Sequence, residues 1–195
     1  PKTVTFNLPE IVRKLMEVSQ DPKALIKETA MVALKSCCSV IDNPDVIPLI
    51  DSVISANVNP DTEGESCLDK LVGTTYVNNV DKPTLAIIVP ILLRGLRVRG
   101  NVNMQRKAAI VMDTMCKLVK DPEDIAPFAD EVVPDLTKNA EEIAIPEVRE
   151  RTGKHVFVLL SVEYDGPGHK GLASTCYTAL RRVLNSSLKD GKMVE

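Results

Sequence analysis

Three prolines recur at nearly equal spacing along this chain, each of them set among Val, Ile and Leu residues. Pro48, Pro90 and Pro134 lie 42 and 44 residues apart. A proline inside an apolar helical pattern bends the helix, because its ring removes one backbone hydrogen bond. A bend that recurs at nearly one period predicts a repeated kinked helix, and with it an architecture built from repeats.

A second helix repeats in step with the prolines. Residues 106–109 and 149–152 each begin with Arg and end, three positions later, with a small residue, and the two copies are 43 residues apart. Residues 27–30 begin with Lys and share this layout, whereas the copy expected near 62–77 fits poorly. Two helices per period predict antiparallel pairs, and these must stack because a lone pair cannot bury its apolar face.

The composition of the apolar residues favours helices over strands. Aromatic residues make up only 3% of the chain, with no Trp, although hydrophobic residues reach 44%. A core of Leu, Ile, Val, Ala and Met suits closely packed helices and disfavours a β-sandwich. We therefore predict an all-α fold, an α-solenoid of about four helix pairs followed by a C-terminal helix. The expected helices cover roughly residues 8–19, 22–41, 44–56, 62–76, 82–97, 102–119, 122–139, 145–162 and 171–188.

One segment interrupts the helical pattern. Residues 163–171 are the only Gly- and Pro-rich stretch of the chain, and this composition is typical of a linker. We expect the solenoid to cover residues 1–163 and the linker residues 164–171. A C-terminal helix is expected within residues 172–195, where it belongs either to the stack or to a following domain.

Residues that usually carry catalysis or bind metals are few. His155 and His169 are the only histidines, and the five cysteines contain no CxxC pair. We predict reduced core thiols, no metal site and no catalytic residue. Gly166–Gly171 lacks the Lys-Ser/Thr ending of a phosphate loop, and no apolar run approaches the ~20 residues that span a bilayer. We therefore expect that this chain is not itself an enzyme and that it binds no cofactor and no small-molecule substrate. We also expect no contact with a membrane.

A basic segment is the best candidate for binding. The net charge is −3, so any contact with nucleic acid must come from a local patch. Five cations and no acid occur from Arg94 to Lys107, across the end of one expected helix and the start of the next. The helix dipole and the repeat pattern account for some of them, so a solvated turn remains the alternative. The candidates for contact with phosphates or an acidic partner are Arg94, Arg97, Arg99, Arg106 and Lys107.

Several stretches resemble the HEAT-repeat region of fungal-type translation elongation factor 3, a family of ABC-type ATPases. They are TTYVNNV at 74–80, VPILLRGL at 89–96, QRKAA at 105–109 and DTMCKLV at 113–119. The resemblance is strongest over residues 73–151, whereas residues 153–170 depart from it. The last helix is weakly similar to the start of the helical bundle that follows the HEAT region in that family. A HEAT segment of the translational regulator that activates the general-control kinase shares the first part.

The resemblance implies a cytoplasmic, monomeric module that binds the ribosome, through ribosomal RNA and ribosomal proteins. The ATP-binding cassettes of the family, with their ATP and Mg²⁺, have no motif in this chain, so the module is expected to be non-catalytic by itself. The alternative is a protein–protein adaptor related to the kinase-activating regulator.

Overall fold

The structure, a computed structural model, describes residues 2–142. This part of the chain forms a stack of α-helices with one short 3₁₀ turn and no sheet beyond a single isolated bridge. The predicted all-α fold is therefore confirmed. The helices are α1 (Lys2–Val18), α2 (Ala24–Cys38), α3 (Ile50–Val58), α4 (Pro60–Gly73), α5 (Lys82–Arg97), α6 (Val102–Leu118) and α7 (Pro122–Glu142), and the 3₁₀ turn is η1 (Ile47–Leu49).

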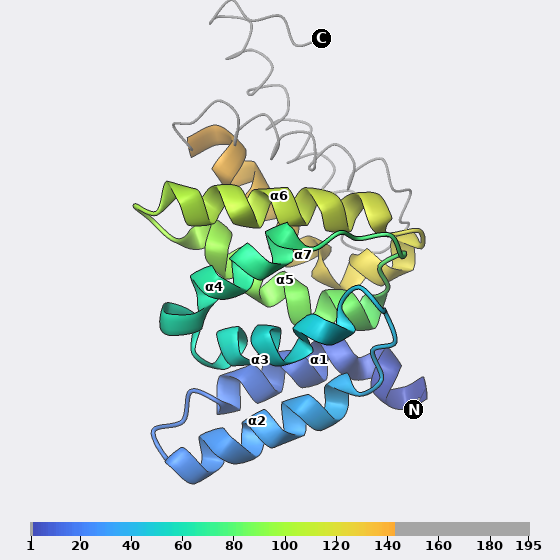
Figure 1. Ribbon diagram of the computed structural model, residues 1–195, viewed down its shortest axis with the longest axis vertical. Coiled ribbons are helices and arrows are strands. Elements are labelled where there is room, and N and C mark those ends of the chain that lie inside the picture. The colour runs from blue at the N-terminus through green and yellow to red at the C-terminus, as the bar shows by residue number, and fades with distance from the viewer. Residues whose placement is uncertain (1, 143–195) are drawn as a thin grey trace, which may run out of the picture.

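The helices stack in pairs, with α1 and α2 at one end and α6 at the other (Figure 1). Neighbours in the sequence pack together, α1 on α2, α3 on α4 and α5 on α6. Because α3 has only nine residues, α1 reaches past it and packs directly on α5. Helix α5 thereby contacts α1, α6 and α7 and forms the centre of the stack, as expected for an α-solenoid.

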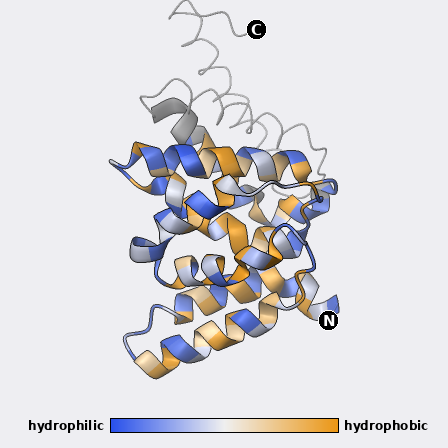
Figure 2. Ribbon diagram, viewed as in Figure 1, coloured by the Kyte–Doolittle hydropathy of each residue, from blue (hydrophilic) through white to orange (hydrophobic). Residues whose placement is uncertain are grey.

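The sequence of α5 explains its central position. The helix starts at a cap in which the Asp81 side chain accepts a hydrogen bond from the Thr84 N–H at 3.1 Å. Of its 16 residues, 12 are buried, and its ribbon is mainly hydrophobic in Figure 2. A helix that is apolar on nearly all sides is stable only when other helices surround it.

The repeated prolines occupy two kinds of position. Pro90 and Pro134 lie inside α5 and α7, as predicted. Pro48 lies in η1, ahead of α3, so the prediction of a proline inside that helix is wrong. The fixed φ and missing N–H of proline fit the first turn of a helix. The same two properties disturb the interior of a helix. Pro9 is also an interior proline, because α1 begins at Lys2 and not near residue 8.

The loops between the pairs are tied to one another along one edge of the stack. The Asp45 carboxylate accepts hydrogen bonds from the backbone N–H groups of Val77 and Asn78, both at 2.8 Å. These bonds lower the pKa of Asp45. Further along the same edge, the Val80 N–H donates to the Leu118 carbonyl at 3.1 Å. Polar contacts thus hold successive pairs in register beside the buried Val46 and Val80 side chains of the same loops.

Three of the four described cysteines are buried, and all four are free thiols. Burial raises the pKa of Cys38 and of Cys116 to about 12 and that of Cys67 to about 11. These thiols are therefore protonated core residues, in line with the prediction. No helix within residues 2–142 is long and apolar enough to cross a membrane. The predicted helices at 145–162 and 171–188, the linker at 164–171, and both histidines lie outside the described residues.

Candidate functional site

The five candidate cations are spread over three elements and do not form one patch. Arg94 and Arg97 are exposed on the last turn of α5, and Arg99 is exposed in the α5–α6 turn. Gly100 has a φ of 87°, a conformation that favours glycine and lets the chain reverse there. Arg106 and Lys107 follow on α6 and are half-buried. The sequence segment is continuous, but its cations do not share one environment.

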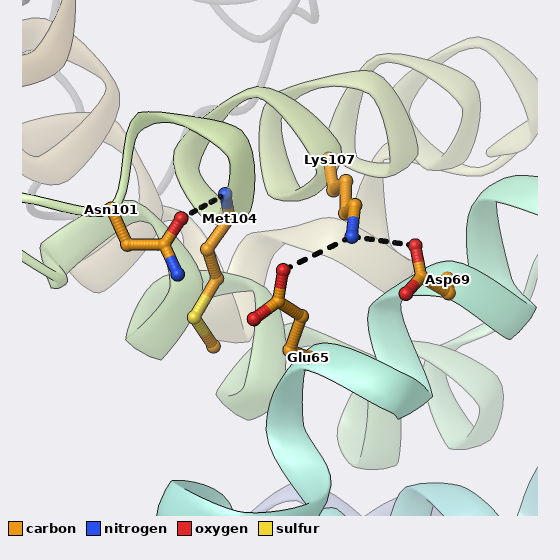
Figure 3. A network of polar contacts seen from close by, with 5 residues as sticks. All are labelled: Glu65, Asp69, Asn101, Met104 and Lys107. Carbon is orange, nitrogen blue, oxygen red and sulfur yellow. Dashed lines mark hydrogen bonds and ion pairs between the residues drawn. The ribbon is translucent and has the colours of Figure 1, made fainter.

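Lys107 is engaged within the stack (Figure 3). Its Nζ lies 2.6 Å from Asp69 Oδ1 and 3.3 Å from Glu65 Oε1, both on α4. Only 16% of its side chain is exposed, and these carboxylates raise its pKa. Lys107 therefore joins α6 to α4, and its role in contact with a partner stays a prediction. The Asn101 side chain accepts a hydrogen bond from the Met104 N–H at 3.0 Å and caps the start of α6 (Figure 3).

The arginines differ in how strongly they are engaged. Arg97 Nε donates to Asp135 Oδ2 at 2.6 Å and so connects α5 to α7. Arg99 and Arg106 also interact with other groups. Within residues 2–142, no ion pair or side-chain hydrogen bond engages Arg94, which is exposed. Arg94 is thus the candidate cation with the most freedom to meet a partner.

The sequence analysis did not predict a groove that lies on the opposite side of α5 from the Lys107 contacts. It has a volume of about 960 Å³ and runs along α1, α5 and α7, with Asn57 of α3 at its floor. No residue of α4 or α6 lines it. Three interior prolines of these helices, Pro9, Pro90 and Pro127, all line the groove.

The walls of the groove carry charges of both signs. Helix α1 contributes Glu10, Arg13 and Glu17, and α7 contributes Asp130 and Glu131. The Glu10 and Arg13 side chains approach to 3.9 Å, a distance typical of a weak surface pair. Helix α5 adds Arg94 and Arg97 at its end of the groove, next to the basic turn. The groove therefore meets the basic turn at these two residues.

The floor of the groove is built around the kink site of α5. Pro90 has no N–H, so the carbonyl of Ala86 loses its usual helical donor, and both residues line the groove. The neighbouring carbonyl, that of Ile87, accepts a hydrogen bond from the buried Asn57 side chain at 2.9 Å. Asn57 thus compensates part of the disturbance that the proline causes, and it joins α3 to α5.

The repeated prolines give only a partial signal for the groove. Of Pro48, Pro90 and Pro134, only Pro90 lines it. The other prolines in its lining, Pro9 and Pro127, lie 81 residues before and 37 residues after Pro90. Among residues 2–142, no group of three or more His, Cys, Asp or Glu side chains lies close enough to hold a metal ion.

Comparison with known proteins places the chain in a family. The family described as "Elongation factor 3/GNC1 HEAT repeat" matches residues 63–170. Elongation factor 3A of Saccharomyces cerevisiae is 37% identical over 96% of this chain, and elongation factor 3 of Gonapodya prolifera is 36% identical over 86%. The mRNA export factor elf1 of Schizosaccharomyces pombe is 36% identical over 76%.

The chain spans only 14–18% of the length of these relatives, so it corresponds to one region of them. The matched family is a helical repeat, and the structure is a stack of helix pairs. The sequence stretches that resemble the factor at 74–80, 89–96, 105–109 and 113–119 all fall within the matched residues. This chain belongs to the elongation factor 3 family and comprises a HEAT-repeat region of it.

Proposed function

We propose that this chain is a ribosome-binding HEAT module of an elongation-factor-3-like ATPase, and that it docks through its shape and the basic turn between α5 and α6. The relatives are named as translation elongation factors, which supports a role in translation. Binding of ATP and Mg²⁺ would fall to the cassettes of the parent protein, and the module would itself be non-catalytic. It would act as a monomer in the cytoplasm.

The observation that carries the proposal is the exposure of Arg94, Arg97 and Arg99 at one edge of the stack. Three guanidinium groups occur within six residues, with no acid among them. Arginine suits phosphate recognition because its planar fork donates two parallel hydrogen bonds. The N-terminus of α6 begins at the same turn, and its partial positive charge favours a nearby anion.

Co-sedimentation with purified ribosomes at two salt concentrations tests the proposal. Changing Arg94→Glu and Arg99→Glu together reverses two exposed charges of the turn. We expect ribosome affinity to fall by at least about tenfold and the dependence of log K on log salt to become shallower by about 2. The matched control is Lys23→Glu with Lys120→Glu, which makes the same charge change at exposed positions outside the turn. Equal losses in both double variants would refute a specific role of the turn.

The second candidate function is a protein–protein adaptor, related to the regulator that activates the general-control kinase. The observation that favours it is the mixed-charge groove, together with a relative named as an mRNA export factor. A pulldown from extract depleted of ribosomes separates the two functions. An adaptor retains its partner in that extract, whereas a module that binds only ribosomes does not.

A further inference from the structure

We propose that the groove along α1, α5 and α7 binds a cationic polypeptide segment that carries apolar residues among its Lys and Arg side chains. This goes beyond the proposed function, because the groove, which meets the basic turn only at Arg94 and Arg97, takes a different class of partner. The turn would contact phosphates, whereas the groove would hold a protein segment.

The α7 wall gives the groove its charge preference. The 21 residues of α7 contain seven carboxylates and one Lys. Two of these carboxylates, Asp130 and Glu131, are exposed and line the groove. Neither forms an ion pair or a side-chain hydrogen bond with another residue of the described range 2–142. They are therefore available to pair with cations of a partner.

The guanidinium groups in the groove do not cancel this acidic wall. Arg97 is already paired with Asp135, a further carboxylate of α7. On α1 the charges pair with one another, Arg13 with Glu10 and Lys14 with Glu17, so within residues 2–142 the unpaired carboxylates of the groove are those of α7. RNA phosphates would meet these α7 carboxylates, and like charges across an interface suppress binding. A polypeptide with Lys or Arg side chains meets the opposite charge at the same places.

The floor of the groove suits an apolar side chain. Met16 and Val98 are half-buried there, and Val89 and Leu93 lie beneath with little exposed surface. An apolar side chain of a bound segment would bury the surface that Met16 and Val98 still expose.

A volume of about 960 Å³ lies at the upper end of the range of small-ligand pockets and accommodates several side chains. The combination of an acidic α7 wall and an apolar floor therefore matches a short basic and apolar segment. No one of these features would select it alone, since an apolar floor admits many ligands and an acidic wall admits any cation.

The test titrates the full chain with a fluorescein-labelled dodecapeptide of Lys-Lys-Leu repeats, followed by fluorescence anisotropy. The comparison variant is Asp130→Lys with Glu131→Lys. Both residues are exposed, so the variant should fold, which circular dichroism melting checks. We expect its affinity for the peptide to fall by at least about tenfold. The matched control, Glu28→Lys with Asp42→Lys, makes the same charge change at exposed sites outside the groove and should bind within about twofold of the unmodified chain.

Two further arms define the partner class. With Arg94→Glu and Arg99→Glu in place, so that the turn does not take up RNA, a Glu-Glu-Leu peptide and single-stranded oligouridylate should not compete with the labelled peptide. Equal peptide binding by the Asp130/Glu131 variant and the unmodified chain would overturn the proposal, and so would effective competition by the RNA. Ribosome sedimentation is read independently. If the turn variant sediments normally while the groove variant loses the peptide, the proposed docking through the turn fails and the groove assignment stands.

Discussion

Helix α5 has two sides that are built differently. Toward α4 and α6, small residues and a paired lysine bring the helices close together. A Cβ atom added at Gly95 would lie only 2.8 Å from the Ala108 Cβ, and Lys107 joins α6 to two carboxylates of α4. Toward α1 and α7, prolines and charged residues surround an open groove. One helix thus forms the core of the stack on one side and lines an open groove on the other.

The largest expected effect comes from filling the close contact on the packed side. Gly95→Leu should lower the free energy of unfolding by about 3 kcal/mol, because the added side chain meets Ala108 and Leu68. Gly73→Leu is the control, since nothing lies within 4 Å of a Cβ at Gly73. It should be neutral or slightly stabilising because Leu favours the helix more than Gly does. Urea unfolding followed by circular dichroism measures both, and equal losses would show that the α5–α6 approach is not tight.

A smaller effect is expected from the paired lysine. Lys107→Met should cost about 1 kcal/mol, because it removes both contacts to α4 but leaves Glu65 and Asp69 largely in solvent. Lys117 provides the control, since it pairs with Asp113 on its own helix. Lys117→Met should cost no more than about 0.5 kcal/mol. The claim that Lys107 joins two helices fails if the two variants unfold at the same urea concentration.

The ion pair on the open side should matter less still. Arg97 is 56% exposed, whereas its partner Asp135 is 18% exposed. Arg97→Gln should therefore cost about 0.5 kcal/mol, because most of the arginine is screened by solvent. Thermal unfolding at low and high salt measures this contribution, which should shrink as salt rises. A loss as large as that of Lys107→Met would remove the distinction between the packed and open sides.

The stability that the Asp45 contacts between the edge loops contribute should depend on pH and not on the packing of α5. Hydrogen bonds to the carboxylate lower the pKa of Asp45 in the folded state, so its contribution is present above the unfolded pKa of about 4 and is lost as the pH falls through the folded value. The unmodified chain should therefore lose stability below about pH 4. Asp45→Asn should remove this part of the pH dependence in urea unfolding curves measured between neutral and acidic pH. An unchanged pH profile would show that the loops are not held by this carboxylate.

Local signals in the sequence predicted much of the fold. The helix expected at 82–97 matches α5, and the helix expected at 122–139 begins at Pro122, as α7 does. These signals act within a few residues, since a cap or a first-turn proline is independent of distant packing. The exception is Pro48, because a proline at this place in the sequence could either start a helix or bend one. The structure places Pro48 in η1, directly before the start of α3.

The site was harder to predict because its contacts join residues about one repeat apart. Glu65 precedes Lys107 by 42 residues, and Asp135 follows Arg97 by 38. The repeat period could have suggested these pairs. The copy near 62–77 fits the pattern poorly, however, so the pattern did not indicate that carboxylates of α4 pair with Lys107. The groove was harder still to predict, since its walls come from the first twenty residues and from α7, which lie more than 100 residues apart in the sequence and both pack on α5.

The central claim is that exposed cations at the α5–α6 turn bind the ribosome, whereas Lys107 only supports the fold. Co-sedimentation of the Arg94→Met and Lys107→Met variants with purified ribosomes tests this most directly, because each removes one positive charge from the same basic segment. The account predicts that Arg94→Met weakens binding several-fold and reduces the salt dependence by about 1, while Lys107→Met binds as the unmodified chain does. Equal binding by the two variants, or a larger loss for Lys107→Met, would contradict it.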